Sequence, residues 1–147
     1  MKGASAYPDA TFTPRVSYGA VKGYQDKAGK DIPYATDYNG LYRRATGKEP
    51  FQLPGRWVKA KGKLNLSTPF DFVSTADTHG GNSGSPTVNT KGEIVGILFD
   101  GNIESLPDRF VYTDTQSRSI HVAAQGIVEA LRNVYAAQRV LSELGLK

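Results

Sequence analysis

The sequence has no cysteine and only two histidines, His79 and His121, among its 147 residues. The absence of cysteine excludes disulfide bonds, thiolate metal sites and catalysis by a thiol. Two histidines are too few for a metal centre built from several imidazoles, so we expect neither a bound metal nor a cofactor. Chemistry that depends on thiols or on several histidines is therefore excluded.

Long apolar runs are also missing. No stretch approaches the roughly 20 apolar residues needed to span a bilayer, and the N-terminus lacks the apolar segment of a secretion signal. The charge is modest, because 18 Lys and Arg oppose 14 Asp and Glu and leave a net charge of +4. We therefore expect a soluble chain without an export signal, for which neither a membrane nor a nucleic acid is demanded as a partner.

The length fits a single domain over residues 1–147. Strand-like segments recur at close spacing, at residues 70–73, 86–88, 93–99, 109–112 and 119–122. The last four segments predict two β-hairpins, the first with its turn at Lys91-Gly92. This pattern favours a mainly-β fold, with one closed or nearly closed antiparallel β-barrel and a C-terminal α-helix.

Two helices are predicted. Residues 37–46 set Leu41 and Tyr42 against Ala45 and precede Gly47, which is typical of a short helix that ends at a glycine. From residue 127 to residue 144, apolar side chains recur at helical spacing. They predict one amphipathic helix of about four to five turns at the C-terminus.

Residues 56–63, RWVKAKGK, place four cations around Trp57. One interpretation is a basic patch with an aromatic stacking surface for single-stranded nucleic acid. The other is an exposed strand or loop whose lysines are solvated while Trp57 packs inward. We favour the second interpretation, and no nucleic acid is expected as a partner.

Residues 78–86 read THGGNSGSP. The glycines allow backbone conformations closed to other residues, so the N–H groups of Gly81 and Ser83 could converge as an oxyanion hole, with Ser83 as the nucleophile. The alternative is that glycine, asparagine and serine simply form a turn. A nucleophilic serine also needs a base within roughly 3 Å. His79 lies too close in the same tight loop, and His121 is expected on a distant strand, so neither completes a triad.

The stretch GGNSGSPTVNTKGEIVGI resembles the nucleophile segment of chymotrypsin-fold serine peptidases. A longer resemblance, to the bacterial dipeptidyl-peptidase 7 and 11 family, covers nearly all of the chain. It is carried by YPDATFT at 7–13, SYG at 17–19, VKGY at 21–24, ATGKEPF at 45–51 and FDGNIESLP at 99–107. The resemblance implies a serine exopeptidase that removes N-terminal dipeptides, of which this chain is the C-terminal half of a trypsin-like catalytic domain, its second barrel.

The resemblance also implies roles for particular residues. Ser83 corresponds to the nucleophile, whereas the histidine and aspartate of the triad belong to a first barrel that, like the family's helical domain, is missing from this chain. The isolated chain is therefore expected to be inactive. Asp100 corresponds to an acid that binds the substrate's N-terminal ammonium. Gly101 takes the place of an arginine found in members that prefer acidic substrates, which implies a hydrophobic or broad preference at the second substrate residue and argues against Asp or Glu.

Three further expectations depend on this resemblance. Asp77, six residues before Ser83, either forms the floor of a trypsin-like specificity pocket or accepts hydrogen bonds from the loop, and we favour the second role. Full-length members of the family are expected in the periplasm. The alternative to an enzyme segment is a truncated, non-catalytic homologue that binds peptides or associates with itself. A lone second barrel would expose an apolar face, so we expect a homo-oligomer.

Overall fold

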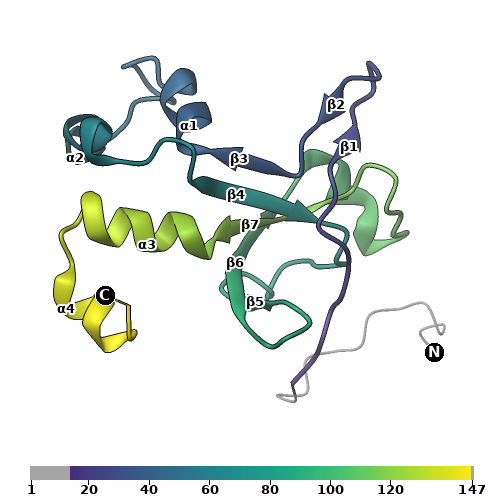
Figure 1. The fold of residues 1–147 in the computed structure, drawn as a ribbon. Coiled ribbons are helices and arrows are strands. Elements are labelled where there is room, and N and C mark those ends of the chain that lie inside the picture. The colour runs from purple at the N-terminus through teal and green to yellow at the C-terminus, as the bar shows by residue number, and fades with distance from the viewer. Residues whose placement is uncertain (1–13, 147) are drawn as a thin grey trace.

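The computed structural model describes residues 14–146, so the YPDATFT block lies outside the described residues. Figure 1 shows a twisted sheet with helices gathered at one end and a two-stranded ribbon beside it. The strands are β1 (Tyr24–Gln25), β2 (Asp31–Ile32), β3 (Ala35–Asp37), β4 (Pro69–Ser74), β5 (Pro86–Val88), β6 (Ile94–Gly101) and β7 (Ser119–Ala123). The helices are α1 (Tyr38–Arg44), α2 (Gly55–Ala60), α3 (Ala124–Asn133) and α4 (Gln138–Glu143), with 3-10 helices η1 (Lys61–Lys63) and η2 (Ile103–Arg109).

The main sheet has five strands in the order β3-β4-β7-β6-β5, and every neighbouring pair is antiparallel. Within residues 14–146, no hydrogen-bonded ladder joins β3 to β5, so these two strands remain edges. The mainly-β fold with a C-terminal helix is thus present, whereas the closed barrel is not confirmed. Among the described residues, no helix has the length and apolarity needed to cross a membrane.

The hairpin predicted around Lys91-Gly92 is confirmed as β5 and β6. Gly92 has a φ of 79°, a left-handed conformation that suits glycine, and its N–H donates to the carbonyl of Asn89. The pairing sets the end of β6 beside the loop that precedes β5, because Pro86 lies opposite Ile97. The hairpin therefore places the loop before β5 and the last residues of β6 at the same end of the sheet.

The second predicted hairpin is wrong. Residues 109–112 form no strand, because Arg109 ends η2 and the next three residues are irregular, so only β7 is extended. A buried arginine, Arg118, organises this segment: its N–H donates to Asn102 Oδ1 at 2.8 Å, and its carbonyl accepts from the Asn102 N–H at 2.9 Å. The segment is thus shaped by contacts across the fold, which outweigh its β-like local pattern.

The helical predictions are partly right. Helix α1 forms as expected, capped by Asp37, whose carboxylate accepts from the Gly40 N–H at 2.7 Å. The single C-terminal helix is wrong, because the chain breaks between α3 and α4, where Ala136 has a φ of 51°. Neither glycine nor proline marks this break.

One cluster of buried apolar side chains lies at the helical end of the molecule, seen at the left of Figure 1, while Phe72, Leu98 and Ala123 are buried in the sheet. The cluster at the helical end consists of Tyr38, Ala60, Leu64, Ala130 and Val134. Trp57 packs against this cluster, with its ring 5.8 Å from that of Tyr38, so the inward position predicted for Trp57 is confirmed. It sits on helix α2, however, and not on the predicted strand or loop.

Candidate active site

The loop between β4 and β5 carries Ser83 at a sharp turn. The Asn82 N–H donates to the His79 carbonyl at 3.1 Å, and the Gly84 N–H donates to the carbonyl of Leu98 on β6 at 2.8 Å. Gly81 and Gly84 have φ values of 102° and 88°, where a residue with a side chain would be strained. The two glycines thus permit the turn that exposes Ser83.

Two backbone donors of this turn are not used within the protein. The N–H groups of Gly81 and Ser83 donate to no acceptor among residues 14–146. The Ser83 hydroxyl makes a long hydrogen bond of 3.4 Å to the carbonyl of Phe99 and is exposed to solvent. A loop in this state can offer both N–H groups and the hydroxyl to a bound ligand.

Neither histidine contacts Ser83 through a hydrogen bond. The His79 ring lies 3.2 Å from the carbonyl of the next residue, Gly80. His121 is buried in the sheet, where Nε2 lies 2.8 Å from Ser74 Oγ and Nδ1 lies 2.7 Å from Thr87 Oγ1. Burial lowers the pKa of His121 to about 4, so the ring is neutral at pH 7.

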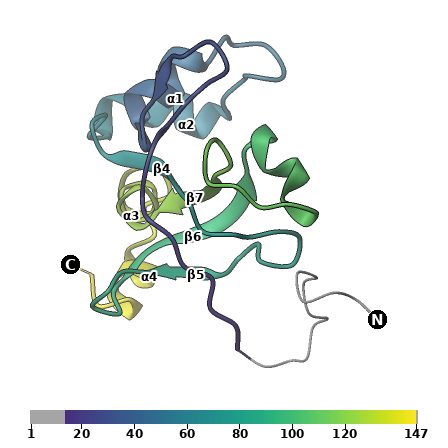
Figure 2. The ribbon, with the colours of Figure 1, turned by 90° about the vertical axis from the view of Figure 1, so that its right-hand side faces the viewer.

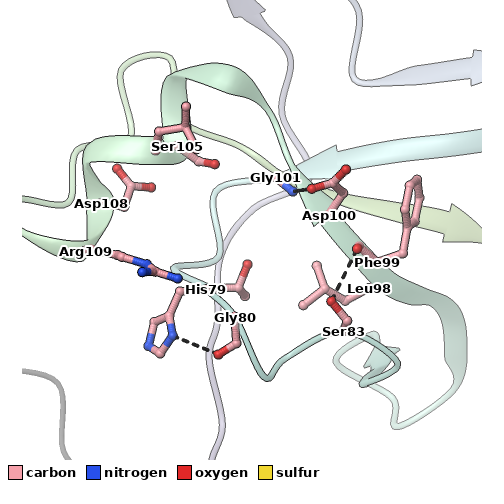
Figure 3. A pocket seen from close by; sticks show the side chains of 12 residues that line it. His79, Gly80, Ser83, Leu98, Phe99, Asp100, Gly101, Ser105, Asp108 and Arg109 are labelled. Atoms are coloured by element: carbon pink, nitrogen blue, oxygen red, sulfur yellow. Dashed lines mark hydrogen bonds between the residues drawn. The ribbon is translucent and has the colours of Figure 1, made fainter.

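A cavity of about 500 Å³ opens beside this loop (Figure 3). It is lined by Thr78, His79, Gly80, Ser83, Leu98, Phe99, Asp100, Gly101, Ser105, Leu106, Asp108 and Arg109. Three predicted site residues, Ser83, Asp100 and Gly101, therefore meet in one cavity. Gly81 is not among the lining residues, and neither is Asp77.

Asp100 and Gly101 form one wall of the cavity. The Gly101 N–H donates to Asp100 Oδ1 at 2.8 Å, which fixes the orientation of the carboxylate. A Cβ atom at position 101 would collide with the hydroxyl of Ser105, which itself donates to the Asn102 carbonyl at 2.7 Å. The absence of a side chain at Gly101 thus makes room for Ser105.

The opposite wall comes from η2, which sequence reasoning missed because residues 109–112 were predicted to be a strand. Asp108 is buried there and accepts a hydrogen bond from the Ser117 hydroxyl. Burial raises the pKa of Asp108. Arg109 follows at the end of η2. No local pattern in the sequence marks these residues as part of the site.

Arg118 supports the same wall from beneath. Its side chain is 1% exposed, and its guanidinium donates to the carbonyls of Lys22 at 2.8 Å and Gly23 at 2.7 Å. It also donates to the carbonyls of Asp114 at 2.7 Å and Ser117 at 2.6 Å. The N-terminal segment and the cavity wall are thereby joined through one buried cation. Figure 2 shows this N-terminal segment crossing the face of the sheet.

The sequence is similar to known dipeptidyl-peptidases. It is 31% identical to an Asp/Glu-specific dipeptidyl-peptidase of Shewanella putrefaciens, over 95% of this chain and 23% of that protein. It is 32% identical to a dipeptidyl-peptidase 7 of Phocaeicola vulgatus, over 93% of this chain and 20% of that protein. The chain thus spans about a fifth of the length of these relatives. Its identity to the Asp/Glu-specific dipeptidyl-peptidase and to the dipeptidyl-peptidase 7 is about equal.

The fold is also shared with a solved structure. DPP11 of Porphyromonas endodontalis, in complex with the dipeptide Arg-Asp, superposes with a TM-score of 0.82 at 23% identity, covering 89% of this chain and 20% of that chain. The sequence also matches the family Peptidase S46 over residues 1–146. Since this match spans almost the whole chain, the protein belongs to the peptidase S46 family.

Proposed function

We propose that this chain is the C-terminal catalytic segment of a serine dipeptidyl-peptidase, with Ser83 as the nucleophile. It would form the second barrel of a chymotrypsin-like catalytic domain and act on the N-termini of peptides. The observation that carries the proposal is the meeting of Ser83, Asp100 and Gly101 in one cavity. The cavity volume of about 500 Å³ is typical of sites that bind small ligands.

The turn around Ser83 supports a role in acyl transfer. Attack of the Ser83 hydroxyl oxygen on the scissile carbonyl would form a tetrahedral intermediate with a negatively charged oxygen. The N–H groups of Gly81 and Ser83, which donate to no described acceptor, would stabilise that oxygen. Removing one donor of an oxyanion hole typically slows catalysis about 100- to 1000-fold.

The proton of Ser83 needs an acceptor that the described residues do not provide. His79 turns its ring to the Gly80 carbonyl, and His121 is held in the interior by Ser74 and Thr87. We propose that the histidine and aspartate belong to a first barrel in a longer protein, and that a helical domain completes the substrate site. An unassisted serine hydroxyl is a weak nucleophile, so the isolated chain is inactive in this proposal.

Asp100 would bind the ammonium group of the substrate. Its carboxylate lines the cavity with Ser83, and the hydrogen bond from the Gly101 N–H holds it in place. A charge-assisted hydrogen bond to the ammonium would set the distance from the N-terminus to the scissile carbonyl. Gly101 adds no charge to the cavity wall, which fits a hydrophobic or broad preference at the second substrate residue.

Labelling with a fluorophosphonate tests the proposal, since this probe reacts only with serines that a base activates. The lone chain should remain unlabelled. Addition of the N-terminal part of a related S46 peptidase in trans should produce labelling and dipeptide release, both abolished by Ser83→Ala. Labelling of the lone chain at Ser83 would contradict the need for an external base, and labelling at another serine would remove Ser83 from its role.

The second candidate is a non-catalytic homologue that binds peptides or itself. One observation favours it: large apolar side chains remain exposed at the end of the described structure that holds the cavity and η2, which we call the site end. They include Ile103, Leu106, Phe110 and Val111, on or next to η2. If the complemented chain gave neither labelling nor dipeptide release while still associating with itself, this second candidate would replace the first.

A further inference from the structure

Arg109 is the only lysine or arginine among the described residues that line the cavity. It lies at the end of η2, across the cavity from Asp100, and Figure 3 shows its guanidinium turned toward the loop that holds His79 and Gly80. The cavity therefore has an acidic wall at Asp100 and a basic wall at Arg109.

The guanidinium of Arg109 lies close to Gly80, in the loop between β4 and β5 that carries Ser83. A Cβ atom placed on Gly80 would lie 3.6 Å from Arg109 Nη2, in van der Waals contact. Any longer side chain at position 80 would compete with the guanidinium for the same space. The absence of a side chain at Gly80 thus leaves space for the Arg109 guanidinium beside the cavity.

The charge of Arg109 is not neutralised by the described residues. Within the 14–146 range, no ion pair joins Arg109 to an acidic side chain. The adjacent Asp108 is 6% exposed and its carboxylate is engaged by the Ser117 hydroxyl. Asp100 accepts from the Gly101 N–H on the other wall. A guanidinium in this setting can bind an anionic group that enters the cavity.

We infer that Arg109 is a specificity-determining residue that binds a side-chain carboxylate on the second residue of the substrate. The inference rests on the proposed function, because it places that second residue in the cavity beside Ser83. A guanidinium presents a planar fork of donors that matches a carboxylate and holds it by two parallel hydrogen bonds. The cavity would then bind the ammonium group through Asp100 and the carboxylate through Arg109.

This inference changes the expectation drawn from Gly101 alone. With glycine at position 101, one wall lacks the arginine of members that prefer acidic substrates. The opposite wall nevertheless carries a cation, Arg109, at the end of η2. The preference at the second residue is therefore broad and includes Asp and Glu. Apolar residues would still be accepted, since Leu98, Phe99 and Leu106 also line the cavity.

The test compares two nearly isosteric ligands by NMR titration of the ¹⁵N-labelled chain at pH 7. The ligands are Ala-Asp-NH₂ and Ala-Asn-NH₂, whose amidated C-termini leave the side chain as the only difference in charge. We expect the acidic ligand to bind about three- to tenfold more tightly, the range of a partly exposed Arg–carboxylate pair. Arg109→Gln should abolish this difference, whereas the charge-matched control Arg43→Gln, on α1, should leave it unchanged.

The outcomes separate the inference from the proposed function. Equal affinity of the two ligands for the unmodified chain would overturn the role of Arg109, while weaker binding after N-acetylation or Asp100→Asn would still support the ammonium site. Failure of both ligands to shift the signals of cavity residues would overturn the role of Arg109 in this chain, whereas the fluorophosphonate experiment would still decide the proposed function. If Arg109→Gln misfolds, Arg109→Lys replaces it, and full retention of the acid preference by this variant would contradict recognition through the guanidinium fork.

Discussion

The two ends of the molecule are held together by different forces. At the helical end, Tyr38, Leu64 and Val134 form an apolar cluster with two alanines. At the site end, the buried polar side chains gather around β7 and η2. They are Ser74, Asp108, Ser117, Arg118, Ser119 and His121. Apolar burial is non-directional, whereas hydrogen bonds fix atoms relative to one another, so the site end gains defined positions for its cavity walls.

The two ends also differ in how far their apolar side chains are exposed to solvent. The helical end covers its apolar cluster with Trp57, Phe70 and other partly buried side chains. The site end leaves Phe110 and Ile103 exposed at 87% and 75%. The helical end exposes apolar side chains too, among them Val58 at 59% and Leu144 at 60%, so the two ends differ in degree, and the more exposed of these four side chains lie on or next to η2.

The largest effect should come from breaking the apolar end. Tyr38 is fully buried, and Tyr38→Ala should lower the free energy of unfolding by about 3–5 kcal/mol, as expected for an aromatic side chain removed from a core. Its hydroxyl donates to the Gly126 carbonyl at 2.6 Å, so Tyr38→Phe should cost only about 1 kcal/mol. Urea unfolding measures both. Similar losses for the two variants would mean that the hydrogen bond, and not packing, dominates this end.

Removing the buried guanidinium at the site end should lower the free energy of unfolding somewhat less than Tyr38→Ala does. It should, however, change the structure of the cavity wall more. Arg118→Met keeps the volume and removes the donors to the carbonyls of Lys22, Gly23 and Asp114. We expect a loss of about 3 kcal/mol because several partly buried hydrogen bonds are lost at once. NMR signals of Gly101 and Asn102 should also shift, which Tyr38→Phe should not cause. Unchanged signals at Gly101 would argue that Arg118 does not position the cavity wall.

Acid should act in opposite directions on two ionisable groups of the sheet, the half-buried Asp71 on β4 and the buried His121 on β7. Burial lowers the pKa of His121 to about 4, so the unfolded chain binds this proton first, and stability on the order of 3 kcal/mol is lost as pH falls from about 6.5 to 4. Burial raises the pKa of Asp71 to about 6. Here the folded chain binds the proton first, so its contribution rises as pH falls through 6.

The two contributions should nearly cancel between pH 4 and 6. Asp71→Asn removes one of them and should make the unfolding free energy fall steeply with acid, as measured by urea titrations across this range. The double variant Asp71→Asn, His121→Gln should restore a shallow dependence. A flat profile for Asp71→Asn alone would mean that folding does not lower the pKa of His121.

The exposed surface at the site end should drive self-association. We expect the chain to form dimers or larger species in sedimentation velocity experiments, and Phe110→Asp with Ile103→Asp to weaken them about tenfold or more through lost apolar burial. Leu144→Asp, at a 60% exposed position of the helical end, is the matched control and should have little effect. A clean monomer at all concentrations would contradict this prediction.

The smallest effect should come from Ser83→Ala. Ser83 is exposed, and its single hydroxyl hydrogen bond is 3.4 Å long. We expect a change in unfolding free energy within about 0.5 kcal/mol, as for most exposed positions. A larger loss would mean that the serine supports the turn structurally, which would favour the interpretation of residues 78–86 as a simple turn.

The parts of the fold that the sequence predicted depend on local signals. The turn at Lys91-Gly92 defined the β5–β6 hairpin, and that hairpin brings Asp100 and Gly101 back to the loop of Ser83. Local patterning therefore sufficed for this half of the cavity, and the family resemblance suggested which residues to look for.

The parts that could not be predicted depend on contacts between distant residues. The conformation of residues 102–118 follows from Arg118, whose guanidinium reaches Lys22 and Gly23, far away in the sequence. Nothing in the local pattern specifies such a contact, so Arg109 was assigned to a strand. The break at Ala136 likewise lacks a glycine or proline signal and leaves α4 free to turn away from α3.

The close approach of Gly101 and Ser105 has a consequence for how the cavity can evolve. A side chain at position 101 meets the Ser105 hydroxyl, so a substitution there is costly while that serine is present. Ser105→Gly first, and a larger residue at 101 second, avoids this clash, whereas the reverse order first forces the Ser105 hydroxyl away from its hydrogen bond with the Asn102 carbonyl. A double-mutant cycle of Gly101→Ala and Ser105→Gly would measure this epistasis, and additive effects would refute it. Through single substitutions, glycine should therefore be gained at position 101 more easily than it is replaced while Ser105 is present.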